Sequence, residues 1–219
     1  MKDNFVLLGG WSRDSNTYRK LVESSPPKNN IYIIPHTTLI PDIKIPSIDK
    51  INEKILRELK QKNFKFITLI GHSLGGAFAI SFAANHPEYV KKLILVDSEG
   101  IPDKRDFAIV VFNWIKDSIF VHGVEKAKEN LKALFRIIQN FPYYFAAARF
   151  ANSIDVGKIA QKIKTPTLIL WGEEDKVVPK ESAKELNQLI KGSRLTVLAG
   201  MDHDWLIHNP QGLWNNIGK

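Results

Sequence analysis

The hexapeptide Gly71-His72-Ser73-Leu74-Gly75-Gly76 is the strongest chemical signal in the sequence. It fits the pattern Gly-x-Ser-x-Gly and stands between a β-rich run and a helical one, which is the setting of a nucleophile elbow. There the serine lies on a strained turn with its hydroxyl exposed, and the glycines let the backbone pass closely. The Leu74 amide would then face the anion that develops when Ser73 attacks a carbonyl. The alternative is an ordinary glycine turn between strand and helix.

A serine hydroxyl is a weak nucleophile unless a neighbouring base accepts its proton. His203 is the candidate base among the six histidines, because its loop, residues 200–205, directly follows the last β-rich run. Such a loop lies at the carboxyl edge of a parallel sheet, where an elbow also opens. His72 is expected to point away from the site, whereas His36 is expected to line its mouth. The alternative for His203 is a surface histidine without a role in chemistry.

The base in turn needs a carboxylate that orients it and stabilises its charged form. Asp175 is the first choice, because the segment 171–179 follows a β-rich run and so reaches the same sheet edge. Glu173 and Glu174 precede the turn and are expected to be solvated. Asp97 remains the alternative acid, since it also ends a β-rich run beside the site.

Short β-rich runs alternate with longer helical patterns along the chain, which predicts an α/β fold with a mostly parallel sheet flanked by helices. Most of the runs are continuously apolar, as expected for strands buried on both faces. The six predicted strands are residues 5–8, 31–34, 66–70, 93–96, 167–171 and 195–198. This order places the serine, the acid and the histidine after three different strands of one sheet.

One connection is too long for a single crossover helix. Seventy residues, 97–166, separate the fourth and fifth predicted strands without a convincing strand between them. A structureless loop of that length would be unusual in a compact domain. Amphipathic patterns around 107–115 and 124–138, followed by an aromatic segment, instead predict helices. We therefore expect a helical cap, residues 99–153, inserted into a core made of residues 1–98 and 154–219.

These segments together resemble the α/β-hydrolase superfamily, and within it the capped, esterase-like branch of small acyl hydrolases and C–C hydrolases. The matching segments are residues 7–11, the elbow at 71–76, and residues 95–98, 166–179 and 200–203. The chain order of serine, then aspartate, then histidine is also that of the superfamily. The resemblance implies that the backbone amide of Trp11 is a second oxyanion donor beside that of Leu74. It also implies that the cap closes over an acyl pocket.

The sequence departs from the family pattern in two places. Family members usually carry His-Gly in the first loop, where this chain has Gly9-Gly10. The chain also begins at what would be the third strand of the family. We therefore expect about six strands and a smaller core.

Composition excludes several kinds of chemistry. The chain has no cysteine, so disulfides, thiolate catalysis and cysteine metal sites are ruled out. No glycine-rich phosphate loop precedes a lysine. The cluster Asp202-His203-Asp204 could in principle bind a metal, but the catalytic interpretation explains the same histidine together with more of the chain. We expect no cofactor and no metal.

The net charge of +8 reflects 31 lysines and arginines against 23 acidic residues, and the lysines are dispersed. Dispersal indicates a solvated surface, and no arginine-rich or aromatic-basic run suggests a nucleic-acid partner. No apolar run reaches the roughly 20 residues that span a bilayer. Only four consecutive apolar residues, 5–8, stand near the N-terminus, where a secretory signal needs about 7–15. A cytoplasmic protein is therefore expected.

The expected activity is hydrolysis of a carboxylic ester through an acyl-enzyme on Ser73. The same scaffold would also support a thioesterase, an aminopeptidase or a C–C bond hydrolase. A non-catalytic protein that only binds a ligand is the alternative from another class, but such a protein would be expected to lack a triad position, and all three candidates are present. We expect a monomer or a weak homodimer.

The expected substrate is a small, uncharged and mostly apolar ester held under the cap. The segment 107–150 carries ten aromatic side chains. Most should pack the cap onto the core, but a few short helices cannot bury so many rings, so some are expected to face the pocket. Gly10, His36, Trp114 and Trp205 are the predicted substrate contacts.

Overall fold

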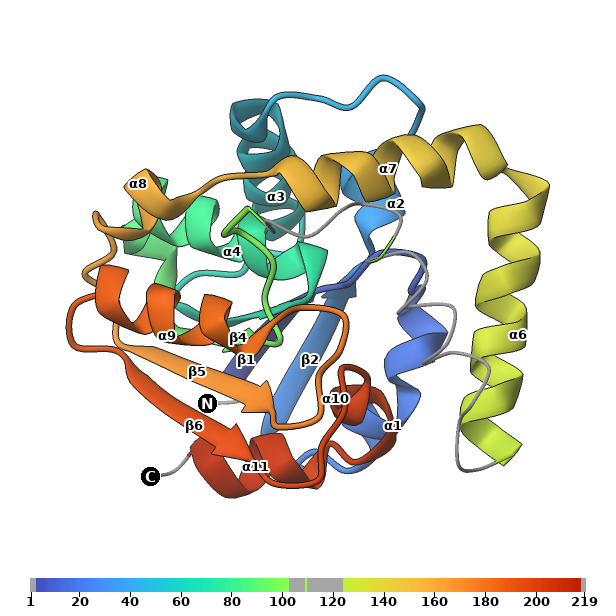
Figure 1. Cartoon of the computed structure of the whole chain (residues 1–219). Helices are drawn as coiled ribbons and strands as arrows, with labels where there is room; N and C mark the ends of the chain where they lie inside the picture. The colour runs from blue at the N-terminus through green and yellow to red at the C-terminus, as the bar shows by residue number, and fades with distance from the viewer. Residues whose placement is uncertain (1–2, 103–108, 110–123, 218–219) are drawn as a thin grey trace.

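Six parallel strands form a single sheet in the computed structural model, which describes residues 3–102, 109 and 124–217 (Figure 1). The spatial order is β2-β1-β3-β4-β5-β6, and every neighbouring pair is parallel. The strands are β1 (Asp3–Leu8), β2 (Asn29–Ile34), β3 (Ile67–His72), β4 (Val90–Val96), β5 (Thr167–Gly172) and β6 (Arg194–Leu198). The prediction of an α/β fold with about six strands is confirmed.

Helices cover both faces of this sheet and bury a separate apolar cluster on each. One face carries α3 (Ile48–Gln61), α4 (Leu74–Asn85), α8 (Gly157–Ala160) and α9 (Lys180–Leu189). The other carries η1 (Ser15–Tyr18), α1 (Arg19–Glu23), α10 (Trp205–His208) and α11 (Gln211–Ile217). The central strands β3 and β5 are buried along their whole length, which explains their continuous apolar sequence.

Helix α4, which begins directly after Ser73, is buried on all sides except at its C-terminal end. Its lack of a polar face follows from its position, because it contacts β3, β1 and β4 on one side and α3 on the other. Phe78 and Phe82 are fully buried within it, and each contributes about 1.5–3 kcal/mol by leaving water. The helix behind the serine is therefore held rigidly against the sheet.

Two helices between β4 and α8 form the described part of the predicted cap. Helix α6 (Val124–Gln139) stands at the side of the molecule, and α7 (Phe141–Ser153) lies above the sheet (Figure 1). They are joined to the core by polar contacts: the Tyr143 hydroxyl donates to the Ile40 carbonyl over 2.7 Å, and the Arg136 Nη1 to Asp14 Oδ2 over 2.6 Å. The amphipathic pattern around 107–115 lies almost wholly outside the described residues. The division into core and cap at residues 98/99 and 153/154 stays a prediction.

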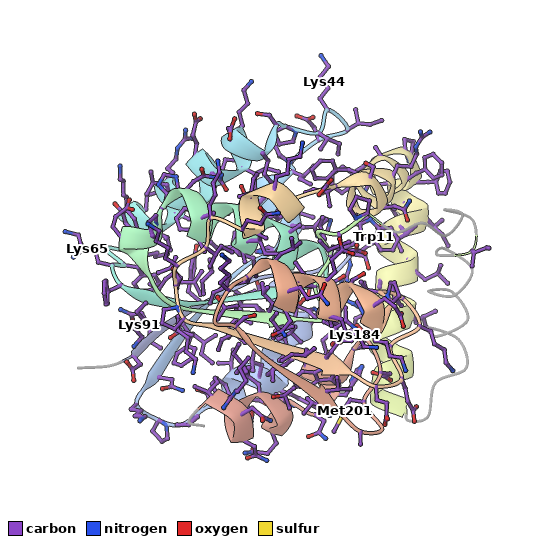
Figure 2. The ribbon with its side chains drawn as sticks, turned by 60° about the vertical axis from the view of Figure 1, so that its left-hand side comes forward. Trp11, Lys44, Lys65, Lys91, Lys184 and Met201 are labelled. Carbon is purple, nitrogen blue, oxygen red and sulfur yellow. The ribbon has the colours of Figure 1, made fainter. Side chains whose placement is uncertain are left out.

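Two short elements complete the description, α2 (His36–Leu39) after β2 and η2 (Pro87–Tyr89) after α4. Lysines lie on separate parts of the surface, as the labelled Lys44, Lys65, Lys91 and Lys184 show (Figure 2). None of the helices within the described ranges is long and apolar enough to cross a membrane.

Candidate active site

Ser73 occupies a strained turn between β3 and α4. Its backbone has φ 53° and ψ −125°, a conformation that costs a non-glycine residue about 1–3 kcal/mol and that is typical of functional sites. The glycines around it permit close approach: a side chain on Gly75 would overlap the Leu8 carbonyl, and one on Gly71 would overlap the backbone of Gly76. The turn therefore has the strained backbone and the close glycine contacts that the sequence pattern predicted for an elbow.

A chain of hydrogen bonds runs from Ser73 to Asp175 through His203. The Ser73 Oγ lies 3.1 Å from His203 Nε2, and His203 Nδ1 lies 2.8 Å from Asp175 Oδ2. The other oxygen of Asp175 accepts from the backbone N–H groups of Val177 and Val178, at 2.8 and 2.9 Å. Because these bonds hold the carboxylate, it in turn holds the imidazole with Nε2 directed at the serine.

The three residues come from loops that follow β3, β5 and β6 at the carboxyl edge of the sheet. Ser73 and His203 are more than a hundred positions apart in the sequence, yet the parallel strands bring all three residues to one place. Glu173 and Glu174 are exposed, as expected.

Asp97, the alternative acid, lies beside this chain of hydrogen bonds without forming part of it. Its side chain is fully buried, and its Oδ1 accepts the Gly172 N–H over 2.7 Å. Burial, and next the nearby Asp175 carboxylate, raise the pKa of Asp97 well above its ordinary value. The geometry therefore places Asp175, not Asp97, on the histidine.

The electrostatics around His203 favour its charged form. Burial opposes protonation of the imidazole, but the carboxylate of Asp175, with smaller contributions from Asp97 and Asp204, outweighs it and raises the pKa of His203 above 6.5. A histidine in this setting readily accepts a proton from a neighbouring hydroxyl and retains it while negative charge develops nearby.

The first loop, after β1, passes directly over the serine. A Cβ built on Gly10 would lie 3.1 Å from the Ser73 Cβ, so the loop backbone is in close contact with the elbow. Trp11 follows, and its indole donates to the Tyr144 carbonyl of α7 over 3.0 Å. Figure 2 shows Trp11 on the side of the molecule that carries these cap helices. Leu74 is the first residue of α4, so its amide belongs to the N–H groups that a helix leaves without an intrahelical acceptor.

A buried ion pair joins the first loop to the histidine loop. The Arg13 Nη2 lies 2.6 Å from Asp204 Oδ2, and the two side chains are only 4% and 7% exposed. Burial alone would raise the pKa of Asp204, but the Arg13 guanidinium outweighs it and lowers the pKa to about 2. The pair is therefore charged across the neutral range. Removing one partner of such a pair typically costs about 3–5 kcal/mol.

A cavity opens at Ser73 between these loops and α7. The first loop and the elbow form its floor, and α7 contributes one wall. Its lining residues are Gly10, Trp11, Arg13, His72, Ser73, Leu74, Glu99, Ala148, Ala151, Asn152, Val177, His203 and Asp204. The cavity thus contains the candidate nucleophile, the base and the first-loop backbone, next to a small apolar surface.

Two of the predicted substrate contacts lie elsewhere. Gly10 lines the cavity, but His36 is fully buried under α7, with its ring 6.1 Å from that of Tyr143. Burial lowers its pKa to about 4. Trp205 begins α10 and packs into the second apolar cluster instead of the cavity, because its short helix turns back towards the sheet. The predictions for His36 and Trp205 were wrong, and Trp114 lies outside the described residues.

The aromatic side chains of the described cap do not line the cavity either. Phe135, Phe141 and Phe145 are exposed, at 61%, 57% and 43%. Tyr144 packs against Trp11, and Phe150 stacks on Phe78 of the core. The cavity wall formed by α7 instead consists of Ala148, Ala151 and Asn152.

Sequence reasoning did not foresee the polar side chains Arg13, Glu99 and Asn152 in this region, and His72 also lines the cavity although it was expected to point away. Arg13, Glu99 and Asn152 line the cavity, and none of them stands in a motif with a recognisable spacing. Their contribution depends on contacts between loops that are far apart in the sequence. Only Glu99 carried a usable signal, since it closely follows the carboxyl end of β4.

Comparisons with known proteins bear on the family to which the chain belongs. The model of the serine aminopeptidase S33 family matches residues 47–210. The chain is 30% identical over 159 residues to the mouse serine hydrolase BPHL, covering 67% of this chain and 51% of that protein. It therefore spans about half the length of that relative. It is 22% identical over 241 residues to a Vibrio vulnificus pimeloyl-[acyl-carrier protein] methyl ester esterase, covering 98% and 92% of the two chains.

A solved structure shares the fold over the full length. The enol-lactonase from Burkholderia xenovorans LB400 superposes with a TM-score of 0.78 at 15% identity, covering 100% of this chain and 90% of that one. At this identity the likeness concerns the fold alone. Combined with the family match across most of the sequence, these similarities show that the chain belongs to the α/β-hydrolases, in the serine aminopeptidase S33 family.

Proposed function

We propose that the protein is a serine-dependent hydrolase of small carboxylic esters, in which Ser73, His203 and Asp175 form the catalytic triad. The observation that carries the proposal is the continuous hydrogen-bonded chain from Asp175 through His203 to a serine on a strained elbow. That serine opens into a cavity, so a substrate carbonyl has access to it. Membership of a serine hydrolase family supports the same chemistry.

In the proposed mechanism, the Ser73 Oγ attacks the ester carbonyl while His203 Nε2 accepts the hydroxyl proton. The Asp175 carboxylate stabilises the imidazolium that results. The backbone amides of Leu74 and Trp11 donate to the tetrahedral oxyanion, and a single such donor is worth about 3–4 kcal/mol. His203 then passes its proton to the leaving alcohol. Water, deprotonated by the same histidine, releases the acid from Ser73.

The proposed acyl site lies between the elbow and α7, under a cap made of residues 99–153. Ala148 and Ala151 leave space there, and Val177 and Leu74 add apolar surface. Arg13 and Asp204 also line this cavity, but they pair with each other and present little free charge to a ligand. An uncharged acyl chain of moderate length therefore suits the site better than a charged one.

We expect kcat/KM for para-nitrophenyl esters to rise from acetyl to medium-length acyl chains and then to fall. Each methylene buried should add up to about 0.8 kcal/mol, or roughly fourfold, until the cavity is full. In an Ala148→Leu variant the optimum should move to shorter chains, because the added side chain occupies the cavity wall. Ala146→Leu, on the same helix but outside the lining, is the control. A profile that is flat, or that does not respond to Ala148→Leu, would refute the proposed acyl site.

A second candidate activity is cleavage of an aminoacyl amide bond. Glu99 lines the cavity beside the elbow, and a carboxylate there is suited to hold a protonated amino group. Amino-acid para-nitroanilides, assayed beside the esters, separate the two possibilities. Faster turnover of the anilides, lost on Glu99→Gln, would favour the aminopeptidase.

We expect kcat/KM for ester hydrolysis to rise with pH, with its midpoint above 6.5. Only neutral His203 can accept the serine proton, so activity requires a pH above the pKa of this residue in the free enzyme. The surrounding carboxylates raise that pKa, which moves the acidic limb of the profile to higher pH. Initial rates measured from about pH 5 to about pH 10 give the midpoint. A midpoint at or below 6.5 would contradict the electrostatic assignment.

A further inference from the structure

A second chain of hydrogen bonds lies next to the proposed catalytic groups and includes none of their reacting side-chain atoms. The Tyr18 hydroxyl, at the end of η1, accepts the Gly10 N–H over 2.9 Å and lies 2.8 Å from His72 Nδ1. The other ring nitrogen of this histidine, Nε2, lies 3.1 Å from the His203 carbonyl. The side chains of Tyr18 and His72 are 0% and 1% exposed. These bonds connect the first loop, the elbow and the loop of the proposed base.

Only one arrangement of protons satisfies these contacts. A carbonyl oxygen can only accept, so His72 Nε2 must carry the proton that it donates to His203. Nδ1 of the neutral ring is then an acceptor, and the Tyr18 hydroxyl donates to it while accepting from Gly10. Burial, and next the neighbouring His203, lower the pKa of His72 to about 3, which keeps the ring neutral. The three hydrogen bonds therefore all run in one direction, from the Gly10 N–H through the Tyr18 hydroxyl and the His72 ring to the His203 carbonyl.

The first loop needs such an anchor because glycine allows many backbone conformations. Two peptide units flank Gly10, and the second contains the Trp11 N–H. The Arg13 N–H holds this second unit through the Gly10 carbonyl over 3.3 Å. The Tyr18 hydroxyl holds the first. With both units held, the backbone between Gly10 and Trp11 is held next to the elbow. Gly9, the preceding residue, has no side chain that could hold this part of the loop.

We infer that Tyr18 is a positioning residue. Its hydroxyl aligns the oxyanion donor of the first loop with the elbow. Through His72, the same hydroxyl links the first loop to the loop of the proposed base. The inference rests on the proposed function. Tyr18 does not line the cavity, so it acts through Gly10 and His72 and not on the substrate. Its ring also packs edge-on against that of His72, with centroids 5.7 Å apart, which fixes the hydroxyl between its two partners.

The test is Tyr18→Phe, which removes the hydroxyl and keeps the ring. We expect kcat for a para-nitrophenyl ester to fall about 10- to 100-fold with KM changed by less than about twofold, because misplaced donors weaken binding of the transition state more than that of the substrate. Tyr32→Phe is the matched control. Tyr32 lies on β2 and does not line the cavity, and its hydroxyl donates to Glu58 of α3 over 2.6 Å. It should match the wild-type protein. A Tyr18→Phe protein that is folded by circular dichroism and has wild-type kcat would overturn the inference.

A second measurement does not depend on activity. Long-range proton–nitrogen NMR correlations report which imidazole nitrogen carries the proton. We expect His72 to be the neutral Nε2–H tautomer, with no titration near 6.5, and we expect its Nδ1 resonance to shift on Tyr18→Phe. The opposite tautomer, or an ordinary titration, would overturn the inference.

The two measurements separate the possible failures. A wild-type protein without ester turnover would contradict the proposed function, and the NMR experiment would still decide the hydrogen-bond assignment. An active wild-type enzyme that is insensitive to Tyr18→Phe would contradict the inference alone.

Discussion

Replacing Ser73 by alanine should abolish ester hydrolysis without unfolding the protein. Loss of the nucleophile of a triad typically lowers kcat by about 10⁴- to 10⁶-fold, because the remaining residues cannot form an acyl-enzyme. The fold should persist, because the bond that the Ser73 side chain makes within the described ranges is to His203, and α4 is held by its own apolar contacts. Alanine adopts the elbow conformation no more easily than serine, so the strain there is unchanged.

The measurement is kcat for a para-nitrophenyl ester, together with labelling by a fluorophosphonate probe and the thermal midpoint. Ser193→Ala is the control, because this serine lies in the turn before β6 and its hydroxyl contacts Asn187, away from the cavity. It should retain both activity and labelling. Near-wild-type turnover by purified Ser73→Ala would show that the chemistry takes place elsewhere. Absence of labelling in the folded wild-type protein would favour a ligand-binding protein over an enzyme.

The second large effect is expected at the acid, where Asp175→Asn should lower kcat/KM by about 10³- to 10⁴-fold. Asparagine preserves the shape of the side chain but not its charge, so it cannot stabilise the imidazolium. The asparagine oxygen would keep accepting from the Val177 and Val178 N–H groups, so its NH2 group would face His203 Nδ1 and donate to it. This leaves the imidazole proton on Nε2, which is the wrong tautomer for accepting the Ser73 proton. The loss of kcat/KM should be greatest at the pH at which the wild-type enzyme is most active.

Asp97→Asn is the matched comparison, because it makes the same chemical change in a buried carboxyl group next to the same histidine. The asparagine Oδ1 can still accept the Gly172 N–H. The pKa of Asp97 is raised by burial, so the loss of its charge should have little effect on catalysis. We expect kcat/KM to change by less than about tenfold. If the two variants exchange ranks, the orienting acid follows β4 and not β5.

Much of the fold could be predicted from local patterns. All six strands were predicted within a few residues, because a strand buried on both faces must be apolar along its length, as β3 and β5 are. The elbow was equally predictable, since a serine at positive φ next to a packed helix requires small neighbours, whatever the rest of the molecule does. Strand order also predicted that the candidate acid and base lie at one edge of the sheet, because the carboxyl ends of parallel strands share that edge.

The choice between Asp175 and Asp97 depended on the tertiary structure. Both follow strands at the correct edge, and neither sequence position states which carboxylate reaches His203 Nδ1. The loop after β5 turns so that Val177 and Val178 donate to Asp175, whereas Asp97 turns towards Gly172. Such directions depend on loop conformation, which the sequence encodes only through contacts with other parts of the chain.

The lining of the cavity was the part least accessible to the sequence. An aromatic-rich helix indicates apolar surface but does not state which face meets the elbow, and α7 directs Ala148 and Ala151 there while Phe141 and Phe145 remain exposed. Tyr18 and Arg13 had no recognisable pattern at all, because their partners, His72 and Asp204, lie 54 and 191 positions away. The sequence alone determined the strands, the elbow and the edge where chemistry is possible, since each is a short-range steric requirement. The partners of each polar group were decided only when distant loops packed together, because a hydrogen bond requires two groups within about 3 Å of each other.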